Sequence, residues 1–170
     1  QLCHEKGLKV TWYVSPYKLR NSTISLLKDY LSQGDNIGLF FYTFFNRLSP
    51  KERLERIDEG LKTFKELFNQ YPNLIGAYYI DSYTLTYVSR NFPFIKGAIA
   101  FCNHEIYVDD FESAGAYYMP YYPSIYNTIV PAKGKYKIDI VVLPFIQRDL
   151  TNCILYGDVL HNLNPQDGIQ

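Results

Sequence analysis

The sequence alternates short apolar runs with amphipathic stretches, and this alternation limits the possible folds more than any other feature. Each run has the length and the β-branched or aromatic content of a strand, and the runs cover residues 8–14, 37–45, 74–80, 95–102 and 138–143. Strand, helix and strand in this order are typical of parallel βα units with right-handed crossovers. The residues alone fit both an open doubly wound sheet and a closed barrel. No glycine-rich phosphate-binding motif follows any of the runs, which weakens the case for a nucleotide-binding sheet.

The best-defined helix is predicted to begin after Ser49. Ser49 and Glu52 have the spacing of a capping box, and Pro50 occupies the first helical position. Apolar residues then recur at steps of three and four as far as Phe68, and Pro72 closes the helix. Shorter helices are predicted at residues 21–34 and 82–90.

Size and charge narrow the class of protein. A chain of 170 residues with 47% apolar content predicts a single domain over residues 1–170, with a tyrosine- and proline-rich insertion at about 103–135. Equal numbers of basic and acidic residues, 17 each, argue against nucleic acid or an anionic lipid surface as a partner. No apolar run is long enough for a membrane span. The three cysteines are widely spaced and suggest neither a zinc site nor a disulfide framework.

The start of the chain looks like the last turn of a helix that ends at Gly7. Because the first residue is Gln1 and not Met, we expect a barrel that lacks its N-terminal strand, with the rest of a longer parent chain packed against it. A signal peptide lost with that start would place the protein in the periplasm or outside the cell.

Two adjoining motifs resemble the polysaccharide deacetylase (NodB-like) family. Residues 33–44 (QGDNIGLFFYTF) are similar to the family's GHEIGLHTYTH motif, and residues 48–52 (LSPKE) to the helix start that follows it. The strand at residues 7–14 is similar to the family's GVKATFFV strand, so the resemblance covers roughly residues 2–80. The whole chain also resembles a set of barrel proteins, found mainly in relatives of Bacteroides, whose function is not assigned.

The resemblance implies a distorted (β/α) barrel of the deacetylase-like type that acts on carbohydrate. Enzymes of that family bind a divalent metal through an aspartate and two histidines four residues apart. The two histidine positions match Phe40 and Phe44 here, and phenylalanine has no lone pair to donate. The aspartate would precede Gln1. We therefore predict no metal or other cofactor and no deacetylase mechanism of the usual kind.

Polar residues that follow the predicted strands are the catalytic candidates, because chemistry in a barrel gathers where strands end and loops begin. Asp81 and Glu105 end neighbouring strands and have the residue types of a glycosidase acid/base pair, with His104 assisting. The same three residues are also suitable ligands for a different metal site. Asp81 fits equally well as the cap of the helix that follows it.

The aromatic content, 17% of the chain, suggests a surface that stacks on sugar rings as well as a packed core. Predicted substrate contacts are Tyr42, Tyr79, Asn103, Tyr118, Tyr121 and Asp149. A glycan is thus the expected ligand. A hydrolase-like barrel is the leading hypothesis, and a non-catalytic carbohydrate-binding barrel or a structural barrel segment of a larger protein is the alternative.

Overall fold

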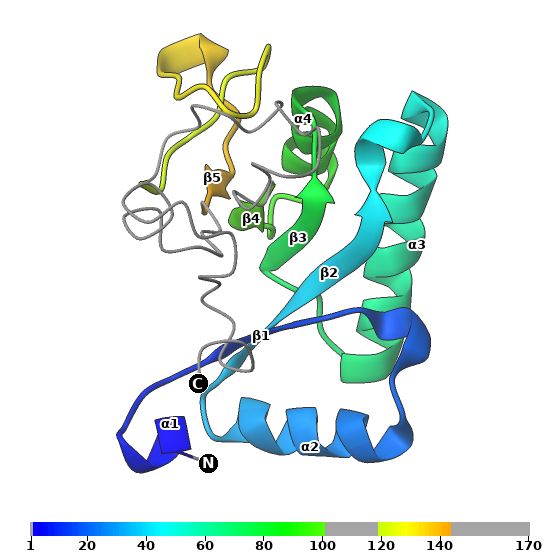
Figure 1. The fold of residues 1–170 in the computed structure, drawn as a ribbon, viewed down its shortest axis with the longest axis vertical. Helices are drawn as coiled ribbons and strands as arrows, with labels where there is room; N and C mark the ends of the chain where they lie inside the picture. Colours follow the sequence, from blue (N-terminus) through cyan, green and yellow to red (C-terminus); the bar gives the residue numbers. More distant parts are fainter. Residues whose placement is uncertain (1, 101–118, 144–170) are drawn as a thin grey trace, which may run out of the picture.

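The computed structural model describes residues 2–100 and 119–143. At its centre is a sheet of five parallel strands in the order β1-β2-β3-β4-β5 (Figure 1). The strands are β1 (Thr11–Val14), β2 (Asn36–Phe44), β3 (Leu74–Tyr79), β4 (Gly97–Ile99) and β5 (Val141–Val142). The predicted parallel α/β organisation is confirmed.

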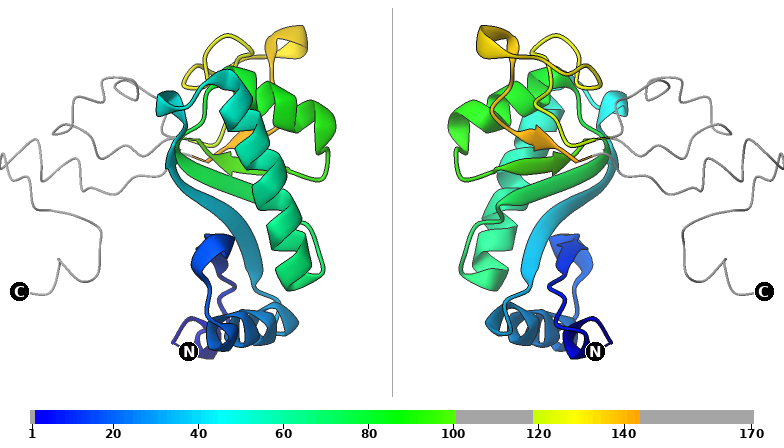
Figure 2. Two further views of the ribbon diagram at one scale, coloured as in Figure 1. Left: turned by 90° about the vertical axis from the view of Figure 1, so that its right-hand side faces the viewer. Right: turned by 90° about the vertical axis from the view of Figure 1, so that its left-hand side faces the viewer.

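Helices connect the first four strands. They are α2 (Asn21–Ser32), α3 (Pro50–Phe68) and α4 (Ser82–Asn91), and a single helical turn, α1 (Leu2–Glu5), precedes β1. Short 3-10 turns follow β1 (η1, Pro16–Lys18) and β2 (η2, Phe45–Arg47), and another precedes β5 (η4, Gly134–Tyr136). In Figure 2, α3 and α4 lie on the same side of β2 and β3, as right-handed crossovers between sequential parallel strands require.

The main core lies between this helical layer and the sheet. Alternate residues of β2 point into it, and Ile37, Leu39 and Phe41 are almost completely buried. The apolar stripe of α3, including Ile57 and Phe64, packs against them. The predicted capping box is confirmed, since the Ser49 side chain accepts from Glu52 and the Glu52 side chain accepts from the Ser49 backbone.

The opposite face of the sheet is built from three pairs of a large residue and a glycine, which we call the glycine pairs. Each large side chain lies over the glycine directly across from it on the next strand, and the pairs are Tyr13–Gly38, Phe40–Gly76 and Leu74–Gly97. A Cβ atom added to these glycines would lie 2.6–2.8 Å from the facing side chain. The missing glycine side chains therefore leave room for Tyr13, Phe40 and Leu74 on this face of the sheet.

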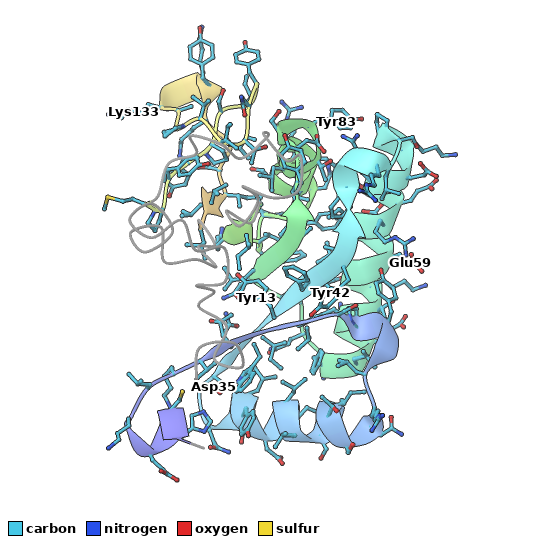
Figure 3. All side chains as sticks on the ribbon, in the orientation of Figure 1. Tyr13, Asp35, Tyr42, Glu59, Tyr83 and Lys133 are labelled. Carbon is cyan, nitrogen blue, oxygen red and sulfur yellow. The ribbon has the colours of Figure 1, made fainter. Side chains whose placement is uncertain are left out.

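A buried carboxylate attaches the N-terminal turn to the sheet at the amino ends of β1 and β2. Asp35 lies there, as Figure 3 shows, and accepts hydrogen bonds from Trp12 Nε1 at 2.7 Å, His4 Nε2 at 2.8 Å and the Val10 amide at 3.1 Å. The Trp12 ring also stacks on Tyr30 of α2, with 5.3 Å between centroids. Strand β1 is thus held to both α1 and α2 at this end.

Closure of the sheet into a barrel is not shown. In the described part of the chain β1 and β5 are the two edges of an open sheet, so the barrel stays a prediction. A doubly wound sheet is defined by a reversal of its strand order. The described strands follow one another in chain order, without such a reversal. Residues 119–135 of the expected insertion form an irregular segment with isolated bridges, and residues 103–118 lie outside the described ranges. None of the described helices is long and apolar enough to cross a membrane.

Candidate functional site

A pocket of about 590 Å³ lies where β1 and β2 approach their carboxyl ends. We call it the tyrosine pocket, and it is lined by Tyr13, Val14, Ser15, Tyr17, Leu19, Phe41, Tyr42 and Arg56. Figure 3 shows Tyr13 and Tyr42 beside each other on neighbouring strands. The carboxyl ends of parallel strands are where α/β folds place their ligands.

Tyr13 forms one wall of the pocket and carries an unusual hydroxyl. Its ring lies over Gly38 and meets Phe40 edge-on, with 6.3 Å between centroids. The hydroxyl oxygen is buried and has no hydrogen-bond partner within the described residues. Burial raises the pKa of this phenol to about 12, so the group stays protonated and able to donate.

Tyr42 is the exposed wall. Its side chain is 68% exposed, although its ring packs edge-on against Phe40 with centroids 5.0 Å apart. Phe41, the residue before Tyr42 in β2, points to the other face of the sheet and is buried against α3 at Gly60. The alternation of the strand thus fixes Phe41 in the core and places Tyr42 on the opposite face of the sheet.

The third wall is made by η1 and α3. The Tyr17 ring lies beneath the Arg56 guanidinium, with 5.7 Å from Cζ to the ring centroid. Burial raises the pKa of the Tyr17 hydroxyl, and the charge of Glu59 adds to this, while Arg56 acts in the opposite direction. Arg56 is also paired with Glu59 at 3.4 Å, in a partly exposed i,i+3 ion pair.

Asp81, the predicted acid/base residue, is engaged in holding two helices. It is the N-cap of α4, where its Oδ1 accepts from the Thr84 amide at 2.9 Å and its Oδ2 from the Thr84 hydroxyl at 2.7 Å. The same Oδ2 accepts from Arg53 of α3 at 2.9 Å. The sequence allowed Asp81 to be either an acid/base residue or a helix cap, and these contacts are those of a helix cap. Within the described residues no group of three or more His, Cys, Asp or Glu side chains could hold a metal.

Two predicted tyrosines lie at different depths in the fold. Tyr79, at the carboxyl end of β3, is half-buried against the core. Tyr121 is 7% exposed, and its hydroxyl donates to the Thr128 carbonyl at 2.8 Å. Burial raises the pKa of the Tyr121 hydroxyl. Tyr121 therefore occupies a core position and not the sugar-stacking position that we expected.

The remaining predicted site residues, Asn103, His104, Glu105, Tyr118 and Asp149, lie outside the described residues. Of the tyrosine pocket, the sequence predicted Tyr42 as a contact and missed Tyr13, Tyr17 and Arg56. Tyr13 had a usable signal, because it is an aromatic residue at the carboxyl end of a predicted strand. Arg56 had none, since it is one of several charged residues on the polar face of a long helix.

Comparison with solved structures shows the fold. The chain is similar to the crystal structure of a "putative glycoside hydrolase/deacetylase" from Parabacteroides distasonis, with a TM-score of 0.61 and 22% sequence identity. The match covers 84% of this chain and 35% of that protein, so the chain spans about a third of its length. No curated protein matches the sequence.

One protein-family model matches nearly the whole chain. It is described as "Domain of Unknown Function with solved-structure structure (DUF3863)", and the match runs over residues 7–170. Its span includes every strand of the sheet and all the residues that line the tyrosine pocket. The chain belongs to the DUF3863 family.

Proposed function

We propose that this protein binds carbohydrate in the tyrosine pocket, on a fold of the glycoside hydrolase/deacetylase type. The observation that carries the proposal is the lining of the pocket, in which three tyrosines from β1, η1 and β2 surround one hollow. Tyrosine offers a flat apolar face to the C–H side of a sugar ring and a hydroxyl to its oxygens. A volume of about 590 Å³ is in the range of small-molecule sites.

The proposal favours binding over turnover for the described part of the chain. None of the described residues that line the pocket is a carboxylate or a histidine, and both oxygens of Asp81 are already hydrogen-bonded. At the position of one family histidine, the Phe40 ring packs against Tyr13 and Tyr42 and offers no ligand atom. Phe40 and the pocket lining therefore do not fit the metal of the deacetylases. The likeness to a glycoside hydrolase/deacetylase fold supports carbohydrate as the ligand class.

The test is calorimetric titration with cellohexaose, xylohexaose, chitohexaose and hexagalacturonate. We expect at least one of these to bind, and Tyr42→Ala to weaken its affinity about tenfold, since stacking by an aromatic ring contributes on the order of 1 kcal/mol or more. Tyr126→Ala is the matched control, because Tyr126 is 75% exposed and does not line the pocket. Equal affinities for the Tyr42 and Tyr126 variants, or no binding by any hexasaccharide, would contradict the proposal.

The same samples separate binding from hydrolysis. We expect no new reducing ends after prolonged incubation with the hexasaccharide that binds. Release of reducing ends that Asp81→Asn abolishes would instead support the acid/base role predicted for Asp81. A variant that only melts earlier, with unchanged affinity, fits the helix-capping role of this residue.

A further inference from the structure

The tyrosine pocket has one charged lining residue in the described part of the chain, and that residue is a cation. Apart from Arg56 the lining is neutral, consisting of tyrosines, one serine and apolar side chains. A neutral sugar needs only hydroxyl and amide partners, so a guanidinium in this wall is additional to what stacking requires. A guanidinium binds most strongly to a ligand group that carries a negative charge.

The contacts of Arg56 hold it beside the pocket and are weak enough for a ligand to compete with them. Its guanidinium lies over the Tyr17 ring, which keeps it beside the pocket by a cation–π contact. Its ion pair with Glu59 is long, at 3.4 Å, and the two side chains are 41% and 59% exposed. Exposed pairs of this kind contribute little to stability, so a bound anion can readily replace Glu59.

The neighbouring acids of α3 have other partners. Asp58 accepts from the Tyr87 hydroxyl at 2.9 Å, and Glu55 pairs with Lys51 at 3.5 Å. Neither residue lines the pocket. Glu59 is therefore the acid with which a ligand would compete, and it is the residue to change in order to measure that competition.

From these contacts we infer that the ligand of the tyrosine pocket is an acidic glycan, in which the carboxylate of a uronic acid unit pairs with Arg56. The inference rests on the proposed function and adds the substrate class. The planar guanidinium presents parallel N–H donors that match the two oxygens of a carboxylate. The tyrosine rings of the pocket are then left for the sugar ring.

The experiment compares hexagalacturonate with its fully methyl-esterified form, which keeps the sugar scaffold and removes the charges. Hexamannuronate and its methyl ester provide a second scaffold. For at least one scaffold we expect the acid to bind about tenfold more tightly than the ester at low ionic strength, as one charge-assisted hydrogen bond would give. The difference should shrink as salt is added.

Two variants assign the effect to the pocket. Arg56→Gln should remove the preference for the acid, so that the acid and its ester bind this variant with equal affinity. Glu59→Gln should strengthen binding of the acid several-fold, because it removes the competing partner of Arg56. Thermal melting of both variants checks folding, and Tyr126→Ala should change neither affinity.

The outcomes separate this inference from the proposed function. Equal binding of acid and ester, or binding of neutral hexasaccharides alone, overturns the inference and leaves carbohydrate binding in place. A preference for the acid that survives Arg56→Gln also overturns it. If a carrageenan-derived hexasaccharide, which carries sulfates and no carboxylates, binds and neither uronate does, the carboxylate assignment is wrong. Failure of every hexasaccharide, neutral and acidic, overturns the proposed function itself.

Discussion

Asp35 joins the N-terminal turn to the sheet through three hydrogen bonds, and its side chain is fully buried. Burial alone raises the pKa of this carboxyl, but hydrogen bonds from Trp12, Val10 and His4 outweigh that effect and hold the pKa below the ordinary value of 3.8. A lowered folded-state pKa stabilises the fold fully above the unfolded-state value, and the contribution is lost as the pH falls through the folded-state value.

We therefore expect the melting temperature to decrease when the pH is lowered beyond about pH 4, in part because Asp35 becomes protonated. Asp35→Asn should lower the melting temperature by several degrees at pH 7 and flatten this acid limb, whereas the exposed Asp29→Asn should do neither. Thermal melts followed by circular dichroism between pH 3 and 7 measure both. An Asp35→Asn variant that melts like the parent at pH 7 would refute the role assigned to this carboxylate.

Tyr13 and Tyr121 both have buried hydroxyls, and these hydroxyls differ in their hydrogen bonding. The Tyr13 hydroxyl has no partner among the described residues, whereas that of Tyr121 donates to the Thr128 carbonyl. Tyr13→Phe should thus leave the free energy of unfolding unchanged or raise it by about 1 kcal/mol, while Tyr121→Phe should lower it by about 1 kcal/mol.

The same pair of variants tests the pocket. The Tyr13 hydroxyl is buried, so it can serve the ligand only if binding uncovers it. In that case Tyr13→Phe weakens hexasaccharide binding several-fold in calorimetry and Tyr121→Phe does not. The opposite pattern, in which Tyr13→Phe destabilises the fold and spares binding, would show that this hydroxyl has a structural partner.

At the scale of elements, the glycine pairs control how the strands carry their large side chains. A Cβ atom on Gly76 would lie 2.8 Å from the Phe40 ring. Gly76→Ala should therefore cost about 2 kcal/mol of unfolding free energy, as overpacking typically does. In a Phe40→Leu background the cost should be smaller, because the ring that clashes is gone. Urea denaturation of the four proteins gives the coupling, and additive effects would mean that the ring does not oppose the new methyl group.

The start of α3 provides a second test at this scale. Ser49→Ala removes the side chain that accepts from the Glu52 amide and should lower the free energy of unfolding by about 1 kcal/mol. Ser25→Ala, at an exposed position inside α2, should leave stability within a few tenths of a kcal/mol. If both variants unfold at the same urea concentration, the capping box does not stabilise α3 as predicted.

The elements were predictable because their signals are local. The Ser49 capping box and the apolar stripe of α3 depend on residues a few positions apart, and the structure confirms both. Strand β4 begins at Gly97, later than its apolar run predicts, because the Ile95 amide donates to the Phe92 carbonyl outside the ladder. The glycine pairs could not be predicted, because register between strands decides which residue faces each glycine.

At the scale of the whole molecule, β1 is an edge and β2 and β3 are interior strands of the described sheet. Amides of β2 and β3 should consequently exchange hydrogen most slowly, and those of β1 faster, in mass-spectrometric measurements at neutral pH. Binding of a hexasaccharide should slow exchange in β1 and η1, which line the tyrosine pocket. Equal protection of β1 and β2 without ligand would indicate that β1 has a second neighbour.

The candidate site was harder to predict than the fold for the same kind of reason. Tyr42 was predicted because it is a tyrosine near the end of the apolar run at residues 37–45. Arg56 is ordinary in its own helix and reaches the pocket only because η1 lies against α3. The Tyr17 ring that it covers is far from it in sequence. A contact of this type depends on how β1, η1 and α3 are arranged in space, which no local pattern encodes.

Trp12 is the single tryptophan of the chain, and its place in β1 makes it an optical reporter that needs no label. Its indole donates to Asp35 and stacks on Tyr30, and its chain neighbour Tyr13 lines the pocket. Emission excited at the red edge of the absorption band will report on this one ring among 17 tyrosines. Acid release of the N-terminal turn and ligand arrival at the other end of β1 can thus be followed by the same fluorophore, and their kinetics compared in one instrument.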